Sequence, residues 1–276
     1  MNLTTLRKNL NSFGELFKIL PRIRDIEETC SDVQVELNQL ISLMNMKDGS
    51  LSIPPKHLQT RVAGIYNARF FISGHNMIND IEHILASCGE TLLKYNNILD
   101  FGCGCGRLMI PLGFMVSPEK IFGTDIDKHA IRWLSGHYPS FQNLDVNHAK
   151  PPTKYSDGMF DFIYGVSVFT HLPEKMQNAW LKELSRILKP GGFGLFTTHG
   201  EKYYNKLTAP ALLELMSRGF YYSIGSVTNG LPEFYQTSYQ THDYIERQWT
   251  KYFEVMTIRK EGIGKNQDAV LVRKRA

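Results

Sequence analysis

Apolar residues recur with a helical period through the first 47 residues of the chain. One stripe, spaced i, i+3, i+7 and i+10, ends before Pro21 and consists of Leu10, Phe13, Phe17 and Leu20. A second stripe runs from Val33 to Met44, and the turn-rich segment 47–56 follows it. The pattern predicts an N-terminal helical arm over residues 1–47 and a second unit over residues 48–276.

The pattern changes to alternating strands and helices in the second unit. Apolar runs of strand length occupy 96–102, 120–126, 159–169 and 193–199, with helix-length segments 107–116, 128–138 and 174–192 between them. This alternation predicts a parallel, doubly wound α/β sheet. The last two runs, 252–262 and 267–275, leave no room for a helix between them, so we expect an antiparallel pair that closes the sheet. The segment at about 200–250 is then an insertion placed to cover a substrate.

A glycine loop follows the first of these strands in the stretch ILDFGCGCGRL, residues 98–108. Gly102, Gly104 and Gly106 allow a tight turn and the close approach of a ligand, and we expect a helix to begin directly after them. Arg107 stands where a dinucleotide fingerprint has its third glycine, which disfavours NAD. Asp125 ends the next strand, where a carboxylate can accept hydrogen bonds from ribose hydroxyls. The combination predicts a nucleoside site.

Composition and charge limit the kinds of site, partner and cellular location that we expect. The chain has 276 residues, a net charge of +4 and four cysteines. Cys103 and Cys105 have no second pair nearby, so we expect neither a metal site nor a disulfide framework. The small net charge, without a concentrated basic run, predicts no nucleic-acid partner. We also expect no signal peptide, no transmembrane segment and a cytoplasmic location.

Four motifs occur in an order that resembles one enzyme family: ILDFGCGCGRL, IFGTDID, FDFIYGVSVFTHL and WLKELSRILKPGGFGLFTTHG. They are similar to successive motifs of the class I S-adenosylmethionine-dependent methyltransferases, over about residues 60–275. The resemblance implies a Rossmann-like seven-stranded sheet of order 3-2-1-4-5-7-6 with the last strand antiparallel. It also implies a methyltransferase activity with S-adenosyl-L-methionine as the cofactor.

The resemblance implies a cofactor site as well. Asp100 and the glycine loop, with Cys103 among its residues, would hold the methionine part, and Asp125 would bind the ribose. The remaining positions are Ile126, Val146 and Asn147 at the adenine, Gly165, Val166 and Ser167 at the sulfonium, and Phe71 and Gly74 over the methionine tail. Many relatives have an acidic residue near Asn147, and here an amide must make that contact.

Histidines near the ends of the later strands are candidates for a general base, which a hydroxyl acceptor needs. We expect His199 and His171 to be catalytic, with His242 as a weaker candidate. For each of them, capping or core packing is the competing interpretation. Tyrosine and phenylalanine side chains between 203 and 244 either line a substrate pocket or pack in the core.

The acceptor is the least specified feature of the chain. The motifs favour a small molecule or glycan, methylated on oxygen by in-line transfer, without a nucleic-acid partner. The alternatives are a protein or nucleic-acid methyltransferase, and a catalytically silent, cofactor-binding partner subunit. The arm at 1–47 packs on its own domain, forms a homo-oligomer, or contacts a membrane surface peripherally, and the sequence leaves these open.

Overall fold

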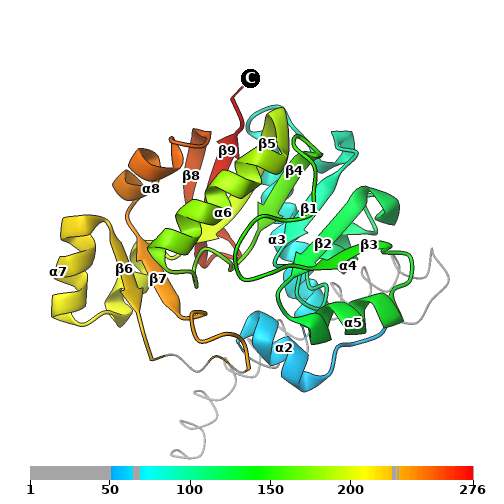
Figure 1. Cartoon of the computed structure of the whole chain (residues 1–276), viewed down its shortest axis with the longest axis horizontal. Coiled ribbons are helices and arrows are strands. Elements are labelled where there is room, and N and C mark those ends of the chain that lie inside the picture. Colours follow the sequence, from blue (N-terminus) through cyan, green and yellow to red (C-terminus); the bar gives the residue numbers. More distant parts are fainter. Residues whose placement is uncertain (1–50, 65–68, 226–227, 229, 276) are drawn as a thin grey trace, which may run out of the picture. The chain divides into compact units, whose positions relative to one another are not determined.

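A seven-stranded sheet forms the centre of the computed structural model, which describes residues 51–64, 69–225, 228 and 230–275. Its strand order is β3-β2-β1-β4-β5-β9-β8. The strands are β1 (Ile98–Phe101), β2 (Ile121–Asp125), β3 (Asn143–Val146), β4 (Phe160–Gly165), β5 (Leu188–Thr198), β8 (Glu254–Ile263) and β9 (Gln267–Arg273). Figure 1 shows these strands side by side across the molecule.

The direction of the strands confirms the predicted fold. The pairs β1–β2, β2–β3, β1–β4 and β4–β5 are parallel. Only the last strand, β9, runs antiparallel to both of its neighbours, β5 and β8. The antiparallel closing pair and the Rossmann-like order are therefore as predicted. The predicted arm at 1–47 lies outside the described residues, so its boundary at residue 48 stays a prediction.

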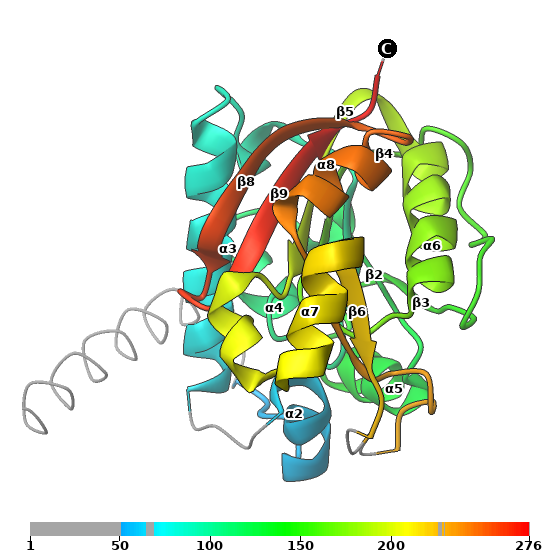
Figure 2. The ribbon, with the colours of Figure 1, turned by 90° about the vertical axis from the view of Figure 1, so that its left-hand side faces the viewer.

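Helices cover both faces of the sheet. Figure 2 shows α3 (Phe70–Ala86) and α6 (Glu174–Ile187) on opposite sides of it. The other elements that precede β5 are α2 (Lys56–Ala63), η1 (Leu92–Lys94), α4 (Met109–Leu112), η2 (Pro118–Lys120) and α5 (Lys128–His137). Among the described residues, no helix combines the length and the apolar character needed to cross a membrane.

One helix is shorter than predicted. The segment 107–116 was expected to form a full helix directly after the glycine loop, but only Met109–Leu112 is helical. Pro111 has no backbone N–H, so it cannot support a longer helix through this position. The loop therefore passes into a run of turns, and its backbone N–H groups are not aligned along a long helix axis.

The core lies between α6 and the sheet. Trp180, Leu181, Leu184 and Ile187 form one face of α6 and are at most 3% exposed. They pack with buried side chains of β4 and β5, among them Phe160 and Phe196. The spacing of these residues is that of one helix face, so burying this face fixes α6 against the centre of the sheet.

The insertion between β5 and β8 is a second layer of small elements. It consists of η3 (Glu201–Lys206), α7 (Ala209–Arg218), β6 (Phe220–Ser223), β7 (Thr237–Gln240) and α8 (His242–Trp249). Strands β6 and β7 form a separate antiparallel hairpin. Its connection to the main domain is polar and buried: Gln177 of α6 donates to Phe169 O, Leu172 O and Ser238 Oγ, and accepts from Gln240 Nε2 at 2.9 Å. These buried polar groups have their hydrogen-bond partners only when the insertion is packed against α6. The network therefore fixes the position of the insertion relative to α6.

Trp249 offers a test of how the insertion is anchored. Its side chain is fully buried against Phe169 and Phe196, and its indole Nε1 has no hydrogen-bond partner. We expect Trp249→Ala to lower the free energy of unfolding by about 3–5 kcal/mol, because a large cavity remains. Trp249→Phe keeps most of the apolar volume and removes an unsatisfied donor, so we expect it to cost less than about 1.5 kcal/mol. Urea denaturation followed by circular dichroism measures both, and equal losses for the two variants would contradict this packing.

Candidate functional site

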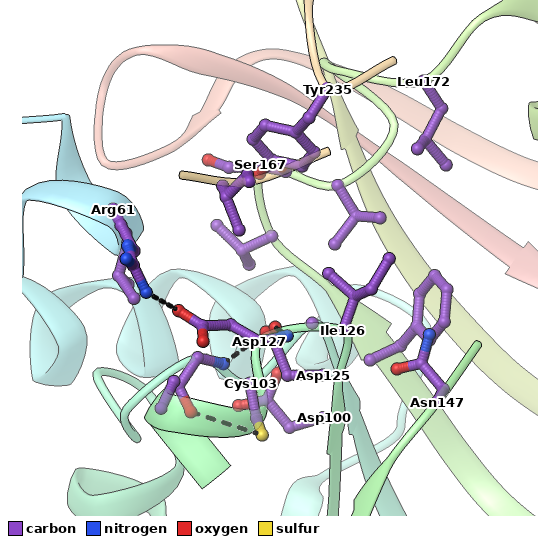
Figure 3. A pocket seen from close by; sticks show the side chains of 18 of the residues that line it. Arg61, Asp100, Cys103, Asp125, Ile126, Asp127, Asn147, Ser167, Leu172 and Tyr235 are labelled. Atoms are coloured by element: carbon purple, nitrogen blue, oxygen red, sulfur yellow. Dashed lines mark hydrogen bonds and ion pairs between the residues drawn. The ribbon is translucent and has the colours of Figure 1, made fainter. Parts of the chain in front are cut away.

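A cavity lies at the carboxyl ends of β1, β2 and β4, where open α/β sheets bind ligands. Its floor is the glycine loop, and Figure 3 shows Asp100, Asp125, Asn147 and Ser167 around it. Of the residues predicted from the sequence, those that line the cavity are Asp100, Gly102, Cys103, Gly104, Asp125, Ile126, Asn147, Val166 and Ser167. Residues that are far apart in the chain thus meet at one edge of the sheet.

The glycine loop is a tight turn that tolerates no side chain at its centre. Gly102, Gly104 and Gly106 have φ values of 84°, 54° and 86°, which glycine adopts without strain. A methyl group added at Gly104 would lie 2.4 Å from Cγ2 of Val62. The loop therefore needs glycine both for its backbone conformation and for the close approach of α2, which contains Val62.

Asp125 connects this loop to the tip of β2. Its Oδ2 accepts a hydrogen bond from Gly104 N and its Oδ1 accepts one from Asp127 N, each at 2.7 Å. Burial raises the pKa of Asp125 to about 6, although these backbone N–H groups oppose the rise. Each carboxylate oxygen has a second lone pair, so the side chain can still accept hydrogen bonds from a vicinal diol. The predicted role of Asp125 in binding a ribose is compatible with these contacts and stays a prediction.

An ion pair brings α2 over the same site. Arg61 Nη1 lies 2.7 Å from Asp127 Oδ2, and the Asp127 side chain is only 8% exposed. Asp127 also caps α5 by accepting a hydrogen bond from His129 N. The pair joins residues 66 positions apart. The sequence contains no local signal for it.

Asp100 is a buried carboxylate on the floor of the cavity. It is 4% exposed and accepts a hydrogen bond from Tyr164 Oη at 2.9 Å. Burial raises its pKa to about 7, and the nearby Asp125 adds to the rise. A cationic ligand group would favour its ionised form, since an opposite charge stabilises a buried carboxylate.

The cysteines of the loop do not participate as reactive groups. Cys103 and Cys105 are free, buried thiols. Burial raises the pKa of Cys105 to about 12 and raises that of Cys103 as well, so both stay protonated. Within the described part of the chain, no three His, Cys, Asp or Glu side chains are grouped to hold a metal ion.

The amide of Asn147, which was predicted to contact an adenine, is fixed by two hydrogen bonds. Asn147 Oδ1 accepts a hydrogen bond from Thr124 Oγ1, and its Nδ2 donates to His148 O. The neighbouring Val146 is 43% exposed and lies outside the lining of the cavity.

The other predicted cofactor residues have supporting positions. Gly106, Gly165, Phe71 and Gly74 are outside the lining as well. Gly165 packs against the end of β1, where an added methyl would lie 3.2 Å from Phe101 O. Phe71 is buried in α3 against Phe70.

A second cavity adjoins the first one. Arg61, Val62, Arg107, Ser167, Leu231 and Tyr235 line both. The second cavity is also lined by polar and aromatic side chains: His171, Tyr203, Gln236, Asn266 and Gln267. Ser167 stands between the two with φ 62°, a strained value for a residue that is not glycine. Its Oγ hydrogen-bonds to the Gln267 side chain.

The two predicted histidines lie close together, and His171 lines the second cavity while His199 is buried behind it, against Tyr203. Their ring centroids are 6.2 Å apart, and His171 stacks on Tyr235 while His199 packs on Tyr203. Nδ1 of His171 is 2.6 Å from Gln236 O and Nδ1 of His199 is 3.1 Å from Ser238 O. Burial lowers the pKa of His171 and brings that of His199 to about 3. Both rings are therefore neutral at pH 7, with Nδ1–H donating to a carbonyl.

The weaker candidate, His242, is not at either cavity. Its Nε2 lies 2.7 Å from Oδ2 of the buried Asp268, where it links α8 to β9. Sequence reasoning missed Arg61 and Arg107 as residues of the site, whereas Tyr235 belongs to the aromatic cluster that was expected either to line a substrate pocket or to pack in the core. Of the two missed residues, only Arg107 could have been found from the sequence, because it directly follows the last glycine of the loop.

Comparisons with known proteins agree with this geometry. Residues 98–192 match a family model described as a methyltransferase domain. A SAM-dependent methyltransferase from Methanosarcina mazei has a similar structure, with a TM-score of 0.53, 21% identity, and coverage of 71% of this chain and 97% of that one. The predicted resemblance and its cofactor, S-adenosylmethionine, are thus confirmed for this domain.

Curated relatives match over a shorter length. A tRNA N(3)-methylcytidine methyltransferase of Drosophila melanogaster is 27% identical, over 50% of this chain and 45% of its own. One from Schizosaccharomyces pombe is 27% identical over 36% and 42%. A 2-methyl-6-phytyl-1,4-hydroquinone methyltransferase of Synechocystis is 29% identical over 41% and 36%. The chain thus spans less than half the length of each.

These relatives correct one prediction. We expected a small-molecule or glycan acceptor and no nucleic-acid partner, because the net charge is small and no basic run is present. Two curated relatives are tRNA methyltransferases, which overturns that expectation. Net charge was a poor guide because a catalytic domain can bind one base in a cavity without a basic surface of its own. The cytoplasmic location stays a prediction.

Asp125 supplies a direct test of the cofactor site. Replacing it with alanine removes both the acceptor for a ribose and the hydrogen bond that holds Gly104. We expect Asp125→Ala to weaken the binding of S-adenosylhomocysteine by about 10- to 150-fold, the equivalent of about 1.5–3 kcal/mol. Titration calorimetry measures this, with Glu246→Gln, an exposed residue of α8, as the control. An unchanged affinity would show that the ribose does not bind at Asp125.

Asp100 predicts a pH effect on the protein without ligands. In the folded protein the pKa of Asp100 is about 7, above its ordinary value of 3.8. The carboxyl therefore binds its proton more tightly in the folded state, which stabilises the fold fully below pH 4. This contribution to the free energy of unfolding is lost as the pH rises to 7. Asp100→Asn mimics the protonated form. We expect it to raise the free energy of unfolding at pH 8, by up to about 4 kcal/mol, with a difference that shrinks toward pH 4.

The difference in stability between the variant and the wild type isolates the contribution of Asp100. His199 also makes stability depend on pH, in the opposite direction, but it does so equally in both proteins. With its pKa lowered to about 3, His199 stabilises the fold above its ordinary value of 6.5 and loses this effect as pH falls. Urea denaturation at pH 4, 6 and 8 makes the comparison. A difference that is independent of pH would contradict a raised pKa at Asp100.

Proposed function

Since this chain contains a class I S-adenosylmethionine-dependent methyltransferase domain, we propose that it catalyses methyl transfer to an acceptor bound in the second cavity. The observation that supports this most is the position of Asp125, whose carboxylate joins the glycine loop to the tip of β2 beneath an open cavity. S-adenosylmethionine, when bound, supplies a methyl group activated on a sulfonium.

The residues of the first cavity fit this cofactor. Asp125 would accept hydrogen bonds from the ribose hydroxyls, Asn147 and Ile126 would contact the adenine, and Val166 and Ser167 would lie near the sulfur; all five line this cavity. The glycines of the loop let Val62 and Val168 pack directly against its backbone, which shapes the wall of this cavity. The ends of three strands hold these groups, so the protein contributes chiefly by positioning the two reactants, which can lower a barrier by as much as about 7–11 kcal/mol.

For the acceptor, we propose a base of RNA, on which a ring nitrogen receives the methyl. The names of two curated relatives support a nucleic-acid substrate. The second cavity offers aromatic rings for stacking, from His171, Tyr203 and Tyr235, and amide groups for hydrogen bonds, from Gln267 and Asn266. These are the contacts by which proteins bind single bases that are extruded from a strand.

The histidines support a ring nitrogen better than a hydroxyl. A ring nitrogen has its own lone pair and needs no deprotonation, whereas a hydroxyl needs a general base. With a pKa of about 3, His199 is a weak base. We therefore assign His171, which lines the second cavity, the role of orienting the acceptor: its neutral ring has Nε2 as a hydrogen-bond acceptor for an exocyclic amino group. His199 supports this wall through its packing on Tyr203.

Methyl transfer from labelled S-adenosylmethionine tests the proposal. The wild-type protein is incubated with unmodified transfer RNA and, separately, with a substituted hydroquinone, and Asp125→Ala is the matched control. We expect label in the RNA, on a base after digestion to nucleosides, and at least about a tenfold lower rate for the control at limiting cofactor. Label only in the hydroquinone, or binding of the cofactor without label in either acceptor, would overturn the RNA assignment. No binding of cofactor would overturn methyl transfer itself.

A further inference from the structure

One side of the second cavity is formed where η3 meets the turn between β8 and β9. Tyr203 of η3 and Asn266 of the turn both line this cavity. Lys202 joins the two segments, because its Nζ donates to Lys265 O and to Glu261 Oε2, each at 2.6 Å. The other side chains of η3 and of this turn therefore stand beside the cavity.

The segments 201–206 and 260–266 contain four lysines, of which two are paired with carboxylates. The four are Lys202, Lys206, Lys260 and Lys265. Glu261 pairs with Lys202 at 2.6 Å, and Glu201 pairs with Lys260 at 2.7 Å. Lys206 and Lys265 are exposed, and neither has a carboxylate at ion-pair distance within the part of the chain that the structure describes. Two positive charges beside the cavity are thus available to an anion.

A further carboxylate near the turn does not neutralise these charges. Asp80 of α3 accepts a hydrogen bond from Gly264 N at 2.7 Å, which ties the turn to α3. It forms no ion pair with the neighbouring Lys265 in the described structure. Asp80 therefore fixes the backbone of the turn and leaves the lysine side chain directed to solvent.

Lys206 holds its charge over an aromatic ring of the cavity. Its Nζ lies 4.4 Å from the centroid of the Tyr203 ring. An ammonium in this position stays charged, because the ring offers only the negative face of its quadrupole and no net charge. The contact with Tyr203 thus positions a cation at the edge of the second cavity.

Lys265 has a backbone conformation that favours glycine. Its φ is 51°, in the left-handed region, where a side chain is strained. The side chain is exposed and makes no ion pair in the described structure, so no such contact offsets the strain. Strained residues that the fold does not need are concentrated at functional sites, and here the position is beside a cavity.

We propose that Lys206 and Lys265 bind backbone phosphates of an RNA strand, on either side of the base that enters the second cavity. The proposal rests on the proposed function, because it needs an RNA base as the acceptor. It makes the strand, and not a free nucleoside, the substrate. A phosphodiester is anionic at neutral pH, and lysine binds it as a point charge. The net charge of the chain gives no sign of this surface, because carboxylates neutralise the other two lysines.

Binding of a short single-stranded RNA measures this surface. A fluorescein-labelled RNA of about ten nucleotides is titrated with the wild type, Lys206→Gln, Lys265→Gln and the double variant, with S-adenosylhomocysteine present. We expect each single variant to weaken binding by about 3- to 10-fold near about 0.1 M salt. The slope of log affinity against log salt should fall by about 0.7 for each lysine removed, because fewer counterions are released. Fluorescence anisotropy at several NaCl concentrations gives both quantities, and an unchanged affinity and slope would overturn the proposal.

Lys182→Gln is the matched control. It removes the same charge from an exposed lysine of α6 that lines neither of the two cavities. We expect it to change RNA affinity by less than about twofold, because a phosphate bound at the second cavity does not contact it. Equal weakening by Lys182→Gln and Lys206→Gln would indicate attraction to the whole protein and would overturn the assignment.

Lys265→Gly separates binding from folding. Glycine adopts the left-handed conformation without strain, so we expect Tm to stay unchanged or to rise while RNA binding weakens as in Lys265→Gln. A lowered Tm would show a structural role for Lys265 and overturn its assignment.

Competition with the four nucleoside monophosphates identifies the source of the phosphate. A strand engages both lysines at once, so we expect these nucleotides to leave the RNA bound even at about a hundredfold excess. Displacement at equal concentration would indicate a free nucleotide and overturn the strand. If the wild type does not bind S-adenosylhomocysteine in titration calorimetry, the proposed function fails, and the same RNA titrations without it still decide the role of the lysines.

Discussion

The hydrogen bonds of the Asp125 carboxylate are the constraint on which the site depends. One oxygen holds Gly104 and the other holds Asp127, so a single side chain connects the glycine loop after β1 with the loop after β2. Asp127 in turn caps α5 and pairs with Arg61 of α2. The floor of the cavity and the helix above it are thus positioned by one carboxylate, whose own burial is tolerated because backbone N–H groups stabilise it.

The site concentrates charge that the protein alone leaves incompletely matched. Asp100, Arg107 and Asp125 all line one cavity, and Asp100 and Arg107 are more than nine-tenths buried. Burial raises the pKa of both carboxyls and lowers that of the guanidinium. We interpret these buried charges as a preorganised binding surface. They cost stability in the free protein, and a bound ligand that pairs with them would stabilise the folded state.

The second cavity, where we propose that the acceptor binds, is lined by neutral rings and amides rather than by buried carboxylates. His171 and His199 are neutral rings held by backbone carbonyls and stacked on tyrosines, and the insertion contributes Tyr203 and Tyr235 to the same wall. The Gln177 network fixes that insertion to α6. The first cavity is therefore built on the ends of strands, while the second cavity is lined in part by the insertion between β5 and β8.

The sequence by itself determined the α/β sheet with its antiparallel closing pair and the glycine loop, because strand alternation and a loop of glycines are local patterns that burial and backbone sterics impose directly. The order of the strands was predicted from the resemblance to the methyltransferase family. The sequence also indicated a full helix after the loop, where Pro111 leaves only four helical residues. Only the tertiary structure decided the contacts made across long separations: the Arg61–Asp127 pair, the close approach of Gly74 to Arg107, and the neighbouring rings of His171 and His199. Such contacts leave no periodic signal, since they depend on where folded elements meet, and they place the charges and rings that select a ligand.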